Sequence, residues 1–508
     1  MRRTTCSSQR LSLIRSSHYT TTTTTTSKSM KEKIVMGIET SCDDTSVAIV
    51  KGDRTILSQC DIAQWDIHRK FGGIVPKLAK ESHEKNIDRA IECALKDANK
   101  SIEEIDAIAV TMGPGIAFSL DVGLEKARQL AKKHSIPFLG VNHLEGHCLT
   151  CRLSDEGAHV QFPFLVLLVS GGHTQLLICH AVGQYTQIGN TLDDSVGEAL
   201  DKAARLLGCE FGELHDGEKL YKNIHGGEAI EILAKKGNHK GYTLPIPMVS
   251  SLNCDFSFSG LKSHLKKTID SLKEKNQQQQ QQQQQQEEQD NTTNDNKLQL
   301  VGGLTNQQRY DLAASFQFTV FMHLVKKTER AFDWYIHNTN KTISQATSVP
   351  SKKSKSSNQN NNQNNNNNNN QNNGSHGDVL LSPPTCLVVT GGVSKNQMLR
   401  KFYQEISSFY KLPVVFPNPS LCTDNGAMIA WAGIEMLKED LNIDPDDAFY
   451  IPVWPLDPSP PTLFATNLTN ETINQRKKWF TDTVEKYSPT GQLPLPLKQK
   501  LQQNNNKK

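Results

Sequence analysis

The same order of strands and helices occurs twice along the chain, and this repeat restricts the fold more than any other feature. In the first half, a short polar turn joins two strand-like segments at residues 34–41 and 45–52, and a third follows at 54–63. In the second half, residues 162–170, 174–182 and 183–191 repeat the arrangement. Segments with helical and strand spacing of apolar residues then alternate in both halves. We therefore expect two similar α/β lobes that face each other across a cleft.

Glycine loops follow buried strands at three places, residues 113–115, 171–172 and 391–392. Glycine lets backbone N–H groups come close to a phosphate. One such loop is usually a plain tight turn. Three of them, each directly after a strand, favour a ligand cleft.

Low-complexity segments interrupt the second half and account for much of the low hydrophobic content of 36%. One insert contains a glutamine tract and the other is rich in asparagine, so neither can bury a core and both are expected to be disordered. The expected division is a catalytic region at 34–455, with lobes at about 34–150 and about 160–440, inserts at 274–300 and 345–377, and a polar C-terminal extension at 456–508.

The N-terminus, residues 1–33, has the composition of a mitochondrial transit peptide. Arginine, serine and threonine dominate it, and the first 31 residues hold no acidic residue. A disordered basic tail is the alternative. Eleven scattered cysteines suit a reducing compartment, and no apolar segment approaches the length of a membrane span. The net charge of +3 predicts no large uniform field for nucleic acid.

The segment "NHLEGH", residues 142–147, places His143 and His147 four residues apart. On a helix both side chains share one face, as two metal ligands would. Zinc proteases carry a glutamate directly beside one of the two histidines, as general base. Here Glu145 lies two residues from each histidine, so it points away from the shared face. The pair suits a metal but not that protease.

Three further residues could complete a metal site. Cys148 and Cys151 follow the pair directly, although two small side chains packed in a helix are the more ordinary interpretation. Asp424 stands at a predicted helix start, capped by Thr423 or Asp424 itself, where open α/β sheets place ligand groups. Two imidazoles and a carboxylate would leave coordination positions open for substrate. Spacing alone does not choose among these candidates.

A set of motifs in fixed order resembles one known family. The motifs are "GIETSCDDTSVAIV", "GGIVPKLA", "TMGPGIAFSLDVGLEKA", "NHLEGH", "LLVSGGHTQL", "TLDDSVGEALDKAARLLG", "DFSFSGLK", "VTGGVSKNQMLR" and "CTDNGAMIAWAG". Together they resemble the universal family of tRNA threonylcarbamoyladenosine transferases, once described as O-sialoglycoprotein endopeptidases. "LEGH" and "CDFSFSGLK" are most similar to the bacterial and mitochondrial branch. With the transit-like N-terminus, the resemblance implies a member in the mitochondrial matrix.

The resemblance implies an actin/hexokinase/Hsp70-like fold of two duplicated lobes. It implies transfer of threonylcarbamoyl from threonylcarbamoyl-adenylate to N6 of the adenosine just 3′ of the anticodon, in tRNAs reading codons that begin with adenine. A homodimer with one divalent metal ion per subunit, zinc or iron, is also implied. The matching metal ligands are His143, His147 and Asp424, and the matching substrate contacts are Leu168, Val169, Ser170, Gly171, Gly172, Asp201, Gly227 and Asn396.

Two segments depart from the family pattern. The usual Y-P-G-G-P after the "LLG" helix is replaced by a longer segment, in which Gly226-Gly227 gives the best alignment. The segment "PKLAKESH" has Lys77 and Glu81 where the family tends to have other charges, while His83 is kept. If these side chains touch tRNA or a partner, that contact has changed.

No residue in these motifs is an obvious covalent nucleophile, because Ser170 in "VSGGH" lacks the G-x-S-x-G elbow. Backbone N–H groups of residues 170–172 are expected to hold the phosphate and developing negative charge. Binding of tRNA is expected to depend on Lys and Arg contacts. A metallopeptidase, an ATPase or sugar kinase of the same fold, and a non-enzymatic nucleotide-binding scaffold remain alternatives.

Overall fold

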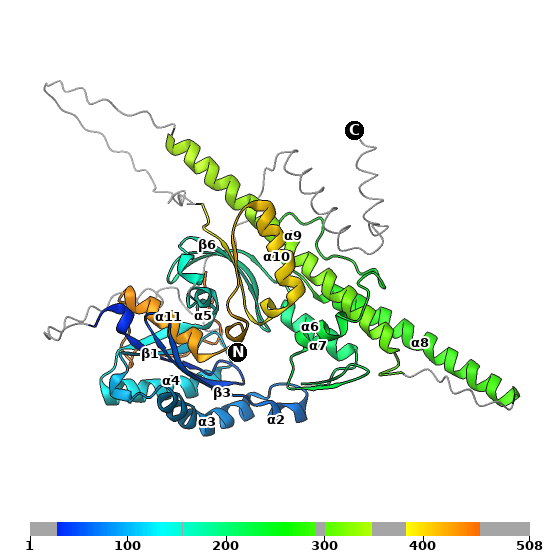
Figure 1. Cartoon of the computed structure of the whole chain (residues 1–508), viewed down its shortest axis with the longest axis horizontal. Helices are drawn as coiled ribbons and strands as arrows, with labels where there is room; N and C mark the ends of the chain where they lie inside the picture. The colour runs from blue at the N-terminus through cyan, green and yellow to red at the C-terminus, as the bar shows by residue number, and fades with distance from the viewer. Residues whose placement is uncertain (1–27, 155, 211, 291–299, 348–382, 458–508) are drawn as a thin grey trace, which may run out of the picture.

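The computed structural model describes residues 28–154, 156–210, 212–290, 300–347 and 383–457 (Figure 1). Nearly all of the predicted transit peptide, the asparagine-rich insert from residue 348 and the C-terminal extension from residue 458 lie outside the described residues. Within the described ranges, no helix is both long and apolar enough to cross a membrane.

The first lobe is built on a five-stranded sheet of order β3-β2-β1-β4-β5. Its first three strands form an antiparallel meander, and β4 and β5 run parallel to β1. One face packs against α3 and α4, and the other packs against α11. The bounds are β1 (Ile34–Glu39), β2 (Thr45–Lys51), β3 (Ile56–Ile62), β4 (Ala107–Gly113), β5 (Phe138–Asn142), α2 (Trp65–His68), α3 (Pro76–Asp97), α4 (Ala117–His134), α5 (His143–Leu149) and α11 (Gly426–Lys438).

The second lobe repeats this topology with the order β12-β11-β6-β7-β8. Strands β6, β7 and β8 again form an antiparallel meander, and β11 and β12 run parallel to β6. The duplicated two-lobed α/β fold is therefore confirmed. The bounds are β6 (Phe164–Val169), β7 (Thr174–Ala181), β8 (Gln184–Asn190), β9 (Glu213–His215), β10 (Leu220–Lys222), β11 (Leu387–Thr390), β12 (Val414–Val415), α6 (Val196–Leu206), α7 (Gly226–Ala234), α8 (Ser259–Asp290), α9 (Asn306–Thr347) and α10 (Gln397–Tyr410).

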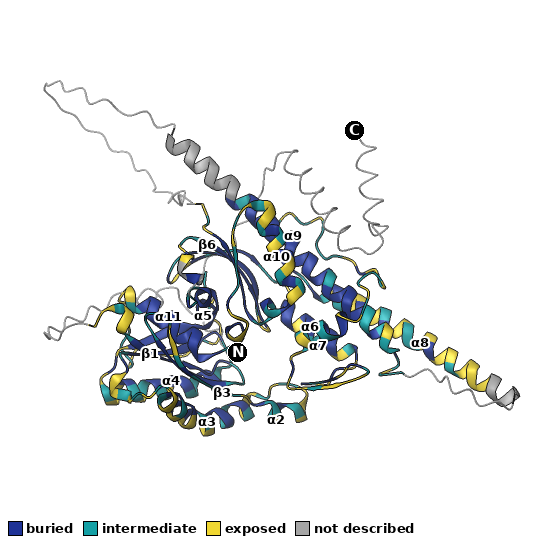
Figure 2. Cartoon of the chain, viewed as in Figure 1, coloured by how far each residue is buried: buried dark blue, intermediate teal, exposed yellow. Residues whose placement is uncertain are grey.

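A continuous apolar core joins the two lobes. Helix α5 contacts strands of both sheets, and α11 packs on the first-lobe sheet and on α5; their buried residues appear dark blue in Figure 2. The sequence predicts that the second lobe extends to about residue 440. Helix α11 lies within that range but packs on β1 and β2 of the first lobe. The approach is close: a Cβ on Gly37 would lie 2.2 Å from the carbonyl oxygen of Gly426.

The glutamine tract differs from the expected disordered loop, because α8 continues through it to Asp290. Glutamine is a good helix former, and extending a helix that already exists avoids the cost of nucleation. Just before the tract, the Asn276 side chain donates hydrogen bonds to the Gly303 carbonyl and to Gln308 Oε1, both at 2.8 Å. These bonds tie the helix to the start of α9. The tract itself is mostly exposed as far as residue 285.

Candidate metal centre and nucleotide loops

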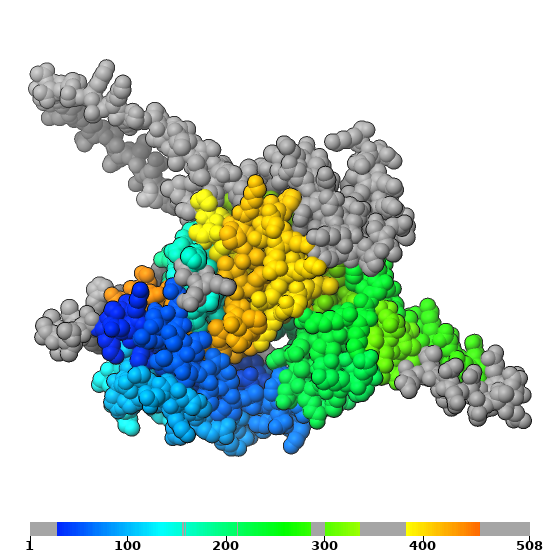
Figure 3. All heavy atoms as spheres, viewed as in Figure 1, coloured from blue at the N-terminus to red at the C-terminus, as the bar shows by residue number. Residues whose placement is uncertain are grey.

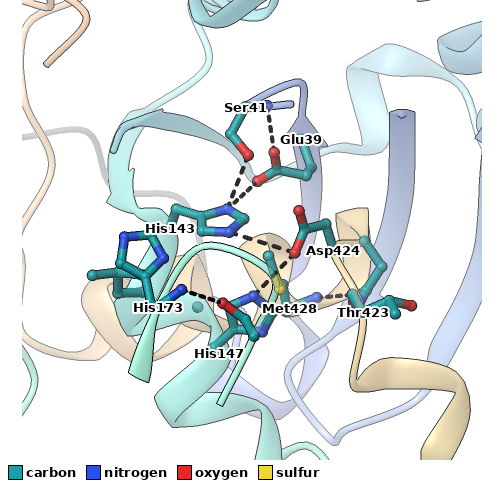
Figure 4. Close-up of polar contacts among 12 residues, drawn as sticks. Glu39, Ser41, His143, His147, His173, Thr423, Asp424 and Met428 are labelled. Carbon is teal, nitrogen blue, oxygen red and sulfur yellow. Dashed lines mark hydrogen bonds and ion pairs between the residues drawn. The ribbon is translucent and has the colours of Figure 1, made fainter. Parts of the chain in front are cut away.

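The histidine pair lies on the short helix α5, directly after β5. Asn142 ends the strand, and its side-chain oxygen accepts a hydrogen bond from the Leu144 N–H at 2.9 Å, which caps the helix. His143 and His147 therefore face the same side one turn apart, with ring centroids separated by 4.9 Å (Figure 4). Both rings are buried. The predicted shared helical face is confirmed.

Asp424 reaches this pair from the segment before α11. The predicted caps, Thr423 and Asp424, are wrong: Asn425 is the N-cap, and its side chain accepts from the Met428 N–H at 2.8 Å. Because Asn425 caps the helix, the Asp424 carboxylate is available elsewhere. Its Oδ1 lies 3.1 Å from His147 Nε2 and 3.5 Å from His143 Nε2.

These three side chains form a group with the geometry of a metal site. Their ligand atoms all lie within 4.8 Å of one another. Zinc bonds to histidine nitrogen and carboxylate oxygen are about 2.1 Å long, so tetrahedral ligand atoms stand about 3.4 Å apart. The separations of 3.1 and 3.5 Å fit that spacing. The residues present therefore suit a divalent metal ion such as zinc.

Glu39 lies behind His143 and orients its ring. Its Oε2 is 3.0 Å from His143 Nδ1 and accepts a hydrogen bond from this nitrogen when it is protonated, while Nε2 faces Asp424. A carboxylate behind a histidine is the usual way to orient a metal ligand. The sequence reasoning missed this residue, although a carboxylate inside a fully buried strand was the available signal.

The charges in this group stabilise one another despite burial. Burial raises the pKa of Asp424, but attraction to His143 and hydrogen bonds with both histidines outweigh it and hold this pKa well below its usual value. Burial likewise lowers the pKa of His143, but the nearby Asp424 and Glu39 carboxylates raise it well above its usual value. Two carboxylates therefore face one imidazole, an arrangement that favours a cation.

The other candidates around the histidines have different partners. Glu145 Oε1 accepts hydrogen bonds from the Gly183 N–H at 2.6 Å and the Tyr185 hydroxyl at 3.1 Å, on the far side of α5. Cys148 and Cys151 are buried in the apolar core that joins the lobes. Neither cysteine belongs to the ligand group.

The loop at residues 170–172 connects β6 to β7 beside α6. Leu168 and Val169 belong to β6 and have buried side chains. The Ser170 N–H already donates to the His173 carbonyl at 2.9 Å, which corrects the expectation that all three N–H groups face a ligand. Gly171 and Gly172 are exposed, and a Cβ on either would meet nothing within 4 Å. The open backbone is therefore that of the two glycines.

The structure brings Asp201 of α6 and Gly227 of α7 together. Burial raises the pKa of Asp201, while the His225 and Arg205 side chains and the N–H groups of Gly226 and Gly227 lower it in part. A Cβ on Gly226 would lie 2.4 Å from Asp201 Oδ1, so only glycine permits this approach. The two substrate contacts implied by the resemblance therefore lie side by side.

Asn396 and His83 have internal roles. The Asn396 oxygen caps α10 by accepting from the Met398 N–H at 3.0 Å, and its amide donates to Gln317 Oε1 at 2.8 Å. A nucleotide would have to displace these bonds to use this side chain. His83 is buried between Thr45 and the Cys42 carbonyl, at 2.7 and 3.0 Å.

Comparison with known proteins points to one family. The family model described as tRNA N6-adenosine threonylcarbamoyltransferase matches residues 55–368 and 376–431. The "Probable tRNA N6-adenosine threonylcarbamoyltransferase, mitochondrial" of Arabidopsis thaliana is 36% identical over 83% of this chain and 75% of its own length. The Pelagibacter ubique enzyme of the same name, without the mitochondrial label, is 35% identical over 84% of this chain and 96% of its own.

Among solved structures, component A of the Acidaminococcus fermentans (R)-2-hydroxyglutaryl-CoA dehydratase is similar, with a TM-score of 0.37 and 12% identity. That similarity covers 80% of this chain and 100% of the other. The family match includes both lobes and spans the segments that carry His143, His147 and Asp424. The chain therefore belongs to the tRNA N6-adenosine threonylcarbamoyltransferase family.

Proposed function

We propose that this enzyme transfers threonylcarbamoyl from threonylcarbamoyl-adenylate to N6 of the adenosine 3′-adjacent to the anticodon in mitochondrial tRNAs reading codons that begin with adenine. The observation that carries the proposal is that one chain holds both a group of side chains suited to a metal ion, His143, His147 and Asp424, and a second lobe with exposed glycine backbone. The mitochondrial part is supported by the N-terminal composition and by the Arabidopsis relative. The homodimer implied by the resemblance belongs to the same proposal.

The adenylate lies along the second lobe in this proposal. Asp201 keeps free oxygen lone pairs beside the Gly226 and Gly227 N–H groups, and these accept hydrogen bonds from ribose hydroxyls. The phosphate lies against Gly171 and Gly172, where no side chain blocks a ligand. Their N–H groups stabilise the negative charge that grows on the phosphate as AMP leaves.

His143, His147 and Asp424 are the proposed ligands of one divalent metal ion, zinc or iron. When bound, that ion supplies Lewis-acid stabilisation of an oxygen of the donor substrate. The chain's own contribution is to keep the His143 ring in place through Glu39. Asp424 lies between the two lobes in the chain, because it belongs to the segment that leads from the last strand of the second lobe to α11 on the first.

Placement supplies much of the acceleration, since the adenine N6 amine is a poor nucleophile. Holding the amine against the carbamoyl carbon turns a bimolecular step into a unimolecular one. The new N–C bond forms as the bond between the carbamoyl carbon and the AMP phosphate oxygen breaks; AMP leaves with that electron pair, and one proton of the N6 amine passes to solvent. The target base belongs to a single-stranded loop, so it can leave its stack without opening a duplex.

A metallopeptidase is less well supported by the site. Glu145 is engaged by Gly183 and Tyr185 away from the metal group. Glu39 accepts from Ser41 and lies against His143, so it is committed to orienting the ring. Neither carboxylate is placed to activate a water molecule.

Nucleoside mass spectrometry tests the proposal. Protein lacking the first 33 residues is mixed with unmodified mitochondrial tRNA and threonylcarbamoyl-adenylate, and the tRNA is digested and analysed. We expect threonylcarbamoyladenosine with the native chain and with Glu439→Ala, an exposed acid beyond the end of α11, but not with Asp424→Ala. Folded, metal-loaded protein that forms no product, even with mitochondrial extract, would refute the assignment.

A further inference from the structure

The two lobes touch at a second place, away from their shared core. Helix α2 and the turn after it, η3 (Arg69–Phe71), leave the first lobe and meet the β9–β10 hairpin of the second (Figure 1). In Figure 3 a narrow hollow separates the lobes, and the blue and green surfaces meet again below it. We call this contact the clasp; it comprises Trp65, Arg69, Gly212, Glu213, Asn223 and His225.

The clasp combines an ion pair, a hydrogen bond and ring contacts. Arg69 Nη1 lies 3.2 Å from Glu213 Oε1, and Nη2 donates to Asn223 Oδ1 at 2.7 Å. One guanidinium thus holds both ends of the hairpin, which a lysine could not do with the same geometry. The Trp65 ring packs on His225 at 4.8 Å between centroids. A Cβ on Gly212 would lie 3.1 Å from the Trp65 ring, so the glycine allows the tryptophan to fit closely.

Both sides of the clasp are held firmly by their own lobes. On the first lobe, buried His68 ties the segment down, with Nε2 3.1 Å from Gln64 Oε1 and Nδ1 accepting from the Val75 N–H at 3.3 Å. On the second, the guanidinium of buried Arg309 donates to the carbonyls of Leu207 and His215 at 2.8 and 3.0 Å. The clasp therefore connects two well-supported segments and is not a contact between loose loops.

The clasp continues directly into the proposed ribose contacts. His225 is the N-cap of α7, and the next two residues are the glycines whose N–H groups face Asp201. The ring that packs on Trp65 thus belongs to the residue just before Gly226. The hairpin is also the segment in which this chain departs from the usual family pattern after its "LLG" helix.

We propose that Trp65 and Arg69 are positioning residues that hold the start of α7 against Asp201 and so preorganise the ribose pocket from across the cleft. This inference rests on the proposed function, which assigns Asp201 and Gly227 to the adenylate. A pocket that is already formed spares the ligand the cost of ordering it. Without the clasp, only a fraction of molecules have the pocket formed, and apparent affinity falls by that fraction.

Trp65→Ala and Arg69→Ala test the inference, with Lys70→Ala as the matched control because Lys70 is an exposed cation beside Arg69. AMP binding is measured by calorimetry, and KM and kcat are measured with threonylcarbamoyl-adenylate. We expect AMP affinity to fall on the order of tenfold in both clasp variants, a typical coupling between sites. KM for the adenylate should rise in parallel, while kcat at saturation and metal content stay as in Lys70→Ala.

A charge exchange provides the rescue. Arg69→Glu should weaken AMP binding, and adding Glu213→Arg should restore it, because the pair is re-formed with its signs reversed. Failure of the second change to restore any affinity would contradict a role through this ion pair.

Asp201→Asn separates failure of the inference from failure of the proposed function. If Asp201→Asn leaves AMP affinity unchanged, the proposed ribose site is wrong and the clasp inference falls with it. If Asp201→Asn weakens binding but the clasp variants bind AMP as Lys70→Ala does, only the clasp inference is overturned. Clasp variants that lose kcat and metal together would show a general structural role instead.

Discussion

The two lobes have the same sheet order but opposite chemistry at corresponding turns. The turn after β1, in the first lobe, follows buried Glu39 and contains Asp43 and Asp44. The matching turn after β6, in the second lobe, contains Gly171 and Gly172 with exposed backbone. The first follows the carboxylate that lies against His143 and adds two further acidic side chains, whereas the second presents backbone to a ligand. Duplication therefore places the turns, and a few side chains decide whether each side of the cleft suits a cation or an anion.

The largest expected effect is the loss of metal binding on the first-lobe side of the cleft, caused by Asp424→Ala. Asp424→Ala removes one of the three proposed ligands and leaves the His143–Glu39 pair intact. We expect metal affinity to fall by more than about a hundredfold, since even changes behind the ligands cost up to that much. Metal content measured by elemental mass spectrometry checks this, with Glu439→Ala as control. Full occupancy in Asp424→Ala would show that the ligand set is different.

Glu39→Gln should have the next largest effect, because the amide cannot hold the His143 Nδ1 proton as the carboxylate does. We expect roughly 10- to 100-fold weaker metal binding, measured by competition with a chelator. AMP affinity at saturating metal should not change. If AMP binding weakened as strongly as metal binding, the division of roles between the lobes would be wrong.

Gly172→Val tests the second-lobe side. A Cβ at this position would meet nothing within 4 Å, so stability is expected to be kept, but the branched side chain fills the space before the backbone. We expect AMP affinity to fall about tenfold, or roughly 1.4 kcal/mol, by calorimetry. Metal affinity should equal that of the native chain. Unchanged AMP binding would place the phosphate elsewhere.

The smallest effect is expected from Glu145→Gln. Burial raises the pKa of this carboxyl, and the glutamine oxygen can still accept from the Gly183 N–H. Metal content and transferase activity should stay within about twofold of the native chain. A change of that size corresponds to less free energy than the roughly 1 kcal/mol that an ordinary hydrogen bond contributes. Loss of activity on a scale of hundreds, with normal metal content, would reopen the possibility that Glu145 acts in catalysis.

Much of the fold follows from short-range patterns in the sequence. Strand meanders, buried helices and the shared face of His143 and His147 depend on periodicity over a few residues, and the structure agrees with these predictions. The insert at residues 274–300 differs from its predicted disorder, because that prediction used composition alone and did not include the helix that precedes the insert. Once α8 has formed, continuing through the glutamine tract costs little.

By itself, the sequence determined where the strands of the two sheets and the helices between them lie, although not the helix through the glutamine tract, and its motifs identified the family. Only the tertiary structure decided which side chains meet. The residue pattern left Asp424, Cys148 and Cys151 open as metal partners, and the fold placed Asp424 on the pair while burying both cysteines. It also engaged Asn396 in a helix cap and placed Trp65 on His225. The physical reason is that periodicity is a local property, whereas these contacts depend on how two sheets and a returning helix pack in space.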